Sequence, residues 1–166
     1  MRFTGQVWFD FSTPSVWVFY QWLRLLAESG ANVGIEWMPL PKGTERAAMS
    51  TLLSLEDPTE RGRYLHAMLG LVHMEGMPAT DLKTVGAALD ASGLDREIVK
   101  DAHPLLENLK TTALSLGVDA VPTLYRTGPV ISIQLNPAVL NDDPRETAQK
   151  IIQVMESDGI WELRKP

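Results

Sequence analysis

The chain of 166 residues contains no cysteine. Disulfide exchange, mixed-disulfide formation and thiolate metal ligation all require a cysteine side chain. The protein's own residues can therefore perform none of these reactions, and a cysteine nucleophile is excluded with them.

Long apolar runs and clusters of basic residues are also missing. No apolar run approaches the roughly 18 residues that a membrane-crossing helix needs. The start of the chain shows no leader pattern of basic residues, apolar stretch and small-residue cleavage site. The formal net charge is −6, with Lys and Arg scattered along the chain. We therefore expect a cytoplasmic protein that binds neither nucleic acid nor a membrane surface.

Histidine is scarce, and the spacing of the three histidines does not favour a metal site. His66 and His73 share a predicted helix face but lie two turns apart, which is roughly 10 Å at the helical rise. That separation is too large for one ion. His103 precedes Pro104 and is interpreted as a loop or capping residue. We expect no metal cofactor.

The residues that are present suit one soluble domain. The apolar fraction is 45 % and the charged fraction 22 %, both ordinary for a globular protein. A chain of this length can bury a proper core but is short for two comfortable domains. We expect a single domain over residues 1–166.

The most informative local pattern is a strand that runs into a helix. Residues 6–11 are β-branched or aromatic apart from Gln6 and Asp10, as in a strand covered on both faces. Ser12-Thr13-Pro14-Ser15 breaks this strand and begins a helix, because proline suits the first helical turn. The apolar helical pattern continues over residues 14–28, and Gly30 supplies a left-handed stop.

The rest of the chain alternates in a recognisable order. The patterns predict a second strand at 33–40, a helical block at 43–117, two short strands at 118–126 and 129–135 joined by Thr127-Gly128, and a last helix starting at Asp143-Pro144. The predicted order is therefore β-α-β, a helical block, then β-β-α.

This order is that of the thioredoxin fold with a helical insertion, and two motifs sharpen the resemblance. Asp10-Phe11-Ser12-Thr13-Pro14-Ser15-Val16-Trp17 resembles the strand-to-helix active-site turn of the DsbA-like superfamily. Val121-Pro122-Thr123 resembles the segment in which thioredoxin-fold proteins hold a cis proline facing that turn. The resemblance implies an α/β thioredoxin fold with a mixed central sheet, a helical insertion at 43–117 and a cis Pro122. A cis proline can also shape the adjoining hairpin without binding any ligand.

Two branches of the superfamily bear on the activity. Disulfide oxidoreductases carry cysteines where this chain has Thr13 and Val16. The glutathione-dependent branch, with kappa-class glutathione transferases and 2-hydroxychromene-2-carboxylate isomerases, carries a serine before the proline, and Thr13 resembles that serine. The resemblance thus implies a catalytic Thr13 and a site for glutathione or a related thiol made by Ser12, Pro14, Ser15, Trp17, Val121, Pro122 and Asn136. Asn136 stands where that branch has an acidic residue that helps to hold the glutathione amino group.

The chemistry expected of Thr13 is hydrogen bonding. No histidine or lysine lies close in sequence to act as its base, so Thr13 is a poor nucleophile. Its hydroxyl can still donate to a bound thiol. The pKa of that thiol, about 8.5 when free, would be lowered by the field at the helix N-terminus. The thiolate would then attack an electrophile or add to a conjugated substrate. In the alternative interpretation Ser12 or Thr13 merely caps the helix, a contribution of about 1 kcal/mol.

The expected partners are a small thiol and an apolar substrate, with a second copy of the chain in a homodimer as a further candidate. A cleft for the apolar substrate could be lined by Trp8, Trp17, Trp37, Trp161, Met68, Met74 and Met77. Large apolar residues at such spacings also serve as core or as a dimer face. The alternative function is a non-catalytic, degenerate DsbA-like module for binding or assembly.

Overall fold

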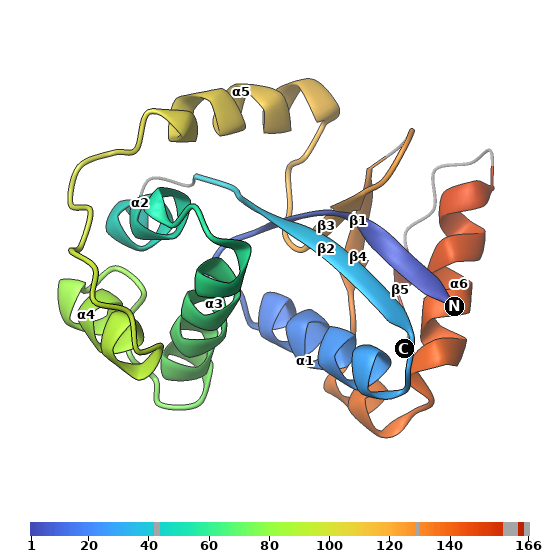
Figure 1. Cartoon of the computed structure of the whole chain (residues 1–166). Coiled ribbons are helices and arrows are strands. Elements are labelled where there is room, and N and C mark those ends of the chain that lie inside the picture. The colour runs from blue at the N-terminus through green and yellow to red at the C-terminus, as the bar shows by residue number, and fades with distance from the viewer. Residues whose placement is uncertain (42–43, 129, 158–162, 165–166) are drawn as a thin grey trace. The chain divides into compact units, whose positions relative to one another are not determined.

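The computed structural model describes residues 1–41, 44–128, 130–157 and 163–164, and the chain forms two compact units. The sheet unit contains Met1–Phe9, Thr13–Met38 and Ala113–Pro166. The helical unit contains Asp10–Ser12 and Pro39–Thr112. Figure 1 shows the elements of both units in chain order.

A mixed β-sheet forms the centre of the sheet unit, with strands in the order β2-β1-β3-β4-β5. Strand β1 is antiparallel to β3, with Val7 opposite Leu124, and β3 is antiparallel to β4. Strands β4 and β5 are parallel, so both strand orientations occur in one sheet. The bounds are β1 Arg2–Phe9, β2 Asn32–Pro39, β3 Thr123–Tyr125, β4 Ile131–Gln134 and β5 Leu163–Arg164.

Helix α1 (Pro14–Glu28) has the bounds that the sequence predicts. It begins with proline at its first position and is followed by Gly30, whose φ of 83° is the left-handed conformation that glycine adopts readily. Helix α1 packs against the 3₁₀ helix η1 (Pro137–Asn141) and against α6 (Pro144–Glu156). The Arg145 guanidinium of α6 donates to the carbonyl of Ser29 and, at 3.2 Å, to its hydroxyl. A cation therefore lies at the carboxyl end of α1, where the helix field favours it.

Aromatic side chains fill the core of the sheet unit. The Trp22 ring is edge-on to Phe3 at a centroid distance of 5.3 Å and lies 5.4 Å from Phe19. These rings belong to one buried cluster with aliphatic residues of the sheet, α1 and α6: Val7, Leu23, Leu26, Leu124, Ile131, Ile133 and Ile151. Burial of this apolar surface holds α1 and α6 on the sheet.

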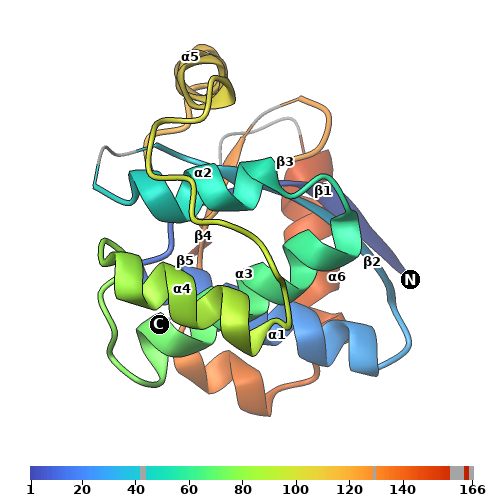
Figure 2. The ribbon, with the colours of Figure 1, turned by 60° about the vertical axis from the view of Figure 1, so that its left-hand side comes forward.

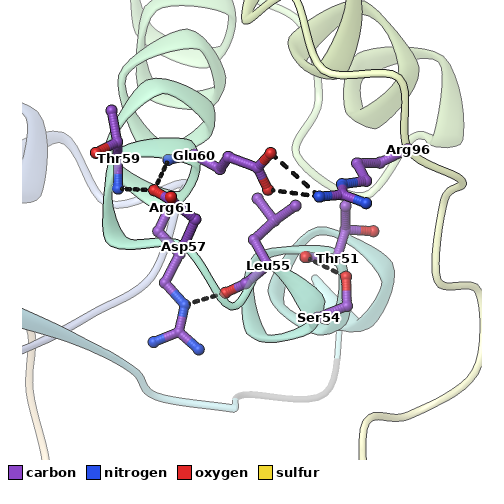
Figure 3. Close-up of polar contacts among 8 residues, drawn as sticks. All are labelled: Thr51, Ser54, Leu55, Asp57, Thr59, Glu60, Arg61 and Arg96. Atoms are coloured by element: carbon purple, nitrogen blue, oxygen red, sulfur yellow. Dashed lines mark hydrogen bonds and ion pairs between the residues drawn. The ribbon is translucent and has the colours of Figure 1, made fainter.

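Four helices form most of the helical unit: α2 (Arg46–Ser54), α3 (Pro58–His73), α4 (Leu82–Ala91) and α5 (Leu105–Leu116), whose last four residues belong to the sheet unit. Helices α3 and α4 lie side by side, and α2 packs against both, as Figure 2 shows. Asp57 caps α3 through its carboxylate, which accepts from the amides of Thr59 at 2.6 Å and Glu60 at 3.2 Å (Figure 3).

An ion pair fixes the segment after α4 to α3 within the same unit. The Arg96 guanidinium donates to both carboxylate oxygens of Glu60 at 3.1 Å (Figure 3). At the turn between α2 and α3 the Arg61 side chain donates to the carbonyl of Leu55. The Arg96–Glu60 pair thus connects segments 36 positions apart, and the Arg61 contact spans the turn between α2 and α3.

The observed elements follow the predicted order, with differences at the strands. The first strand ends at Phe9 instead of Phe11, because Asp10–Ser12 belong to the helical unit. The predicted strand 118–126 contracts to residues 123–125, and Pro129, the predicted start of the next strand, lies outside the described residues. Strand β5 is an addition. Two residues are too short to show a periodicity, and pairing with β4 defines them.

Helices α2 to α5 lie between β2 and β3 in the chain, where the insertion at 43–117 is predicted, although residue 43 itself is not described. The assignment of residues 1–166 to a single domain stays a prediction. None of the helices in the described part of the chain has both the length and the apolar character needed to cross a bilayer.

Candidate functional site at the start of helix α1

Thr13 is the N-cap residue of α1, with an extended backbone at φ −74° and ψ 120°. Its carbonyl accepts from the amide of Val16 at 3.0 Å, which closes the first turn. Its half-buried side chain makes no capping hydrogen bond within the described first turn. The Thr13 hydroxyl therefore does not cap α1, contrary to the alternative interpretation.

The second predicted motif lies beside this helix start, inside the same sheet unit. The Ser15 hydroxyl donates to the carbonyl of Val121 at 3.3 Å. The Val121–Pro122 peptide bond is cis, the isomer expected from the motif, and both residues are buried. The carbonyl of Pro122 accepts from the amide of Ile133 at 2.9 Å, and the Thr123 hydroxyl donates to the carbonyl of Ala120 at 2.7 Å. Strand β4 thus holds this segment in place next to α1.

The other predicted site residues of the sheet unit have simpler surroundings. Pro14 is exposed at the first position of α1. Trp17 is half-buried and stacks on Tyr20, with ring centroids 6.0 Å apart. Asn136 is exposed, and its side-chain oxygen accepts from the amide of Ala138 at 2.9 Å, which caps η1. The structure thus gives Asn136 a local capping role.

Ser12, the remaining predicted site residue, belongs to the helical unit and contacts a carboxylate there. The Ser12 hydroxyl donates to Oε1 of Glu45, a residue 33 positions away. The other oxygen, Oε2, accepts from the amide of Phe11 at 2.7 Å. Glu45 is only 6 % exposed, whereas the Ser12 side chain is exposed. One buried carboxylate therefore binds both a backbone amide and the hydroxyl of an exposed residue.

His73 contacts the same short segment from α3. Its Nε2 lies 2.8 Å from the carbonyl oxygen of Phe11, so it donates there when Nε2 carries the proton. Glu45 and His73 therefore hold the two backbone polar groups of Phe11. Sequence reasoning considered His73 only as a metal ligand and did not single out Glu45, so it missed the contacts of both residues. Their partner lies 34 and 62 positions away, respectively, and no spacing pattern signals such a contact.

Burial shifts the protonation of these two residues in opposite directions. Burial raises the pKa of the Glu45 carboxyl, against the hydrogen bonds from Ser12 and Phe11, and the nearby Asp10 raises it further. Burial lowers the pKa of His73, against the Phe11 carbonyl and Asp10, which raise it. In both residues the low local dielectric disfavours the charged form.

We expect these shifts to give the helical unit opposing pH dependences. The Glu45 pKa is raised above its ordinary 4.5, so its contribution to stability is fully present below that value and is lost as the pH rises through the raised pKa. The His73 pKa is lowered below its ordinary 6.5, so its contribution is present above that value and is lost as the pH falls through the lowered pKa. Urea unfolding at a series of pH values, from below the ordinary pKa of glutamate (4.5) to above that of histidine (6.5), measures both contributions.

Isosteric variants separate the two contributions. Glu45→Gln should lose the decline of unfolding free energy with rising pH, and His73→Gln should lose the decline with falling pH. Profiles that keep the wild-type slopes in both variants would refute this assignment.

The described residues contain no group of three or more histidine, aspartate or glutamate side chains placed to hold a metal ion. His103 acts as a capping residue, as predicted, because its Nδ1 accepts from the amide of Leu105 at 3.2 Å.

The aromatic and methionine residues predicted to line a cleft differ in burial. Trp8 and Met68 are fully buried, so they are core residues. Trp17 and Trp37 are half-buried, and Met74 is 74 % exposed. Trp161 lies outside the described residues.

The element order, the mixed sheet and the Val121–Pro122 segment beside the start of α1 define a thioredoxin-fold protein with a helical insertion. Solved structures of DsbA-like proteins share this architecture. Proteus mirabilis ScsC in a transitional conformation matches with a TM-score of 0.63 and 17 % identity, over 89 % of this chain and 67 % of its own. A periplasmic thioredoxin-like protein from Salmonella enterica serovar Typhimurium matches with a TM-score of 0.63 and 16 % identity, over 88 % of this chain and 84 % of its own.

Pseudomonas aeruginosa DsbA matches with a TM-score of 0.57 and 16 % identity, over 93 % of this chain and 86 % of its own. No protein-family model and no curated protein matches the sequence. At these identities the likeness shows the fold. The chain thus has the α/β thioredoxin fold of DsbA-like proteins, as predicted, in a form without cysteine.

Proposed function

We propose that this protein binds glutathione or another small thiol at the start of α1 and uses the bound thiol as a transferase or isomerase acting on an apolar substrate. The observation that carries the proposal is the 3.3 Å contact between the Ser15 hydroxyl and the Val121 carbonyl. It brings together, within one compact unit, the two motifs that the resemblance pairs in a thiol site.

The electrostatics of the helix start support an anionic ligand. Helix α1 is 15 residues long and has no acidic residue in its first turn. The field at its amino end therefore favours negative charge. A thiol held beside the Thr13 hydroxyl would have a lowered pKa, and its thiolate would attack an electrophile or add to a conjugated bond.

Titration with millimolar glutathione should raise the melting temperature of the protein. A ligand that binds only the folded state stabilises it by mass action, by about 2.7 kcal/mol at a hundred times its Kd. Thr13→Ala removes the hydroxyl, and Val121→Asp places a carboxylate where the thiolate would lie. Both variants should therefore shift much less than the parent protein in differential scanning fluorimetry.

Thr111→Ala is the matched control, because this exposed threonine on α5 donates to the carbonyl of Glu107 within its own helix. It should retain the full glutathione response. The proposal fails if the parent protein shows no shift, or if Thr13→Ala and Val121→Asp shift as much as the parent.

A non-catalytic, degenerate DsbA-like module is the second candidate function, and one observation favours it. The Val121 carbonyl already accepts an intramolecular hydrogen bond from Ser15, which a ligand would have to share or displace. Under this alternative, glutathione, bacillithiol and mycothiol all fail to stabilise the protein.

The proposal also includes a cytoplasmic location, which cell fractionation tests, and a homodimer, which light scattering tests.

A further inference from the structure

The contact between Ser12 and Glu45 in the helical unit has the arrangement of a nucleophile with its base. The Ser12 side chain is exposed and its hydroxyl donates to Oε1 of Glu45, while Glu45 is 6 % exposed. The hydroxyl of an exposed residue thus faces a buried carboxylate. The hydroxyls of Ser54 and Ser92 in this unit donate to backbone carbonyls instead, that of Ser54 to Thr51 at 2.7 Å.

An effective nucleophile–base pair requires a third group that orients the base, and the Phe11 amide is that group here. Oε2 of Glu45 accepts from the amide of Phe11 at 2.7 Å, so the plane of the carboxylate is fixed. Phe11 is itself anchored. Its side chain is fully buried with its ring edge-on to Tyr64 at 6.4 Å, and its carbonyl lies 2.8 Å from Nε2 of His73. Glu45 therefore presents Oε1 to Ser12 from a rigid support.

We propose that Ser12 and Glu45 form a nucleophile and general-base pair that accepts acyl groups from small activated esters, an activity separate from thiol binding. Burial raises the pKa of Glu45, which brings the proton affinity of the carboxylate closer to that of an effective base at neutral pH. Asp10, which is also buried, acts in the same direction.

The reaction takes place in two steps, acylation of Ser12 and hydrolysis of the acyl-serine. In the first, Ser12 Oγ attacks the carbonyl carbon of the ester, Glu45 takes the hydroxyl proton, and the bond from carbon to the leaving oxygen breaks with its electron pair on the departing alcoholate. Protonation of the alcoholate returns Glu45 to its ionised form. In the second step Glu45 takes a proton from water, the resulting hydroxide attacks the acyl carbon, and the bond from that carbon to Ser12 Oγ breaks with its electron pair on the oxygen. Glu45 then returns its proton to Ser12 Oγ, which restores both residues and releases the carboxylic acid.

The test uses the full chain and 4-nitrophenyl acetate as the probe. Wild-type protein should release 4-nitrophenolate above the buffer rate and carry one acetyl group on Ser12, located by peptide mass spectrometry after rapid quenching. The protein-dependent rate constant should fall by about 100-fold or more in Ser12→Ala and in Glu45→Gln, since general-base assistance has this magnitude. Ser54→Ala should react like the wild type, because its hydroxyl faces a backbone carbonyl.

In Glu45→Gln the side chain can still accept from the Phe11 amide and donate to the Ser12 hydroxyl. A loss of rate in this variant, with wild-type circular dichroism, therefore reports the loss of the base and not of the fold. Unchanged rates in Ser12→Ala or Glu45→Gln would overturn the proposal. Acetylation of wild-type protein at a residue other than Ser12 would overturn it too, and this readout holds even if a variant fails to fold.

Discussion

Replacement of Trp22 by alanine is expected to lower the free energy of unfolding of the sheet unit by about 3–5 kcal/mol. Trp22 is fully buried and contacts the rings of Phe3 and Phe19, so truncation leaves a large cavity among aromatic neighbours that cannot close it. Urea unfolding gives the loss of free energy. Hydrogen exchange should place the loss of protection in β1, α1 and α6.

Trp22→Phe is the informative control for this prediction. The Trp22 indole N–H is buried without a hydrogen-bond partner among the described residues, so phenylalanine removes an uncompensated polar group while keeping most of the ring. We expect it to cost far less than alanine, because the gain from losing the unpaired N–H offsets part of the smaller cavity. Equal losses in Trp22→Ala and Trp22→Phe would contradict this account of the core.

Phe11→Ala should destabilise the helical unit by a similar amount, about 3–5 kcal/mol. The Phe11 ring is fully buried against Tyr64, and its loss also loosens the backbone to which Glu45 and His73 bind. Hydrogen exchange measured by mass spectrometry should show faster exchange in α3 and at the start of α2, with a matching decrease in the urea midpoint.

Phe11→Leu supplies the comparison, since it keeps the backbone contacts and most of the apolar volume. A swap between apolar residues of similar size costs less than about 1.5 kcal/mol. A wild-type urea midpoint in Phe11→Ala would show that the segment is not anchored by this side chain.

The elements that sequence predicted best are those specified by neighbouring residues. Helix α1 has its predicted bounds because Pro14 fixes its first turn and Gly30 its left-handed stop. Strand β5 was not predicted, because its two residues are defined by pairing with β4. Likewise, no local sequence pattern indicated that the first strand ends at Phe9.

The contacts of the candidate site also differ in how far the sequence could predict them. The proximity of Ser15 and Val121 could be predicted, because the two motifs belong to one known fold pattern. The contacts of Ser12 and Phe11 with Glu45 were not, because a lone glutamate before a helix resembles an ordinary solvated residue in the sequence. The role of Asn136 could have been read locally. Asparagine followed by proline is a typical helix start, and Asn136 caps η1.

The tripeptide Asp10–Ser12 makes the helical unit discontinuous in the chain. A fragment of residues 39–112 alone would omit it, and with it the amide, hydroxyl and carbonyl that Glu45 and His73 contact. Such a fragment would lose these hydrogen bonds together with the buried Phe11 ring that packs edge-on to Tyr64. The insertion is therefore not a portable module, and a chimera that grafts it onto a related scaffold must carry both segments together.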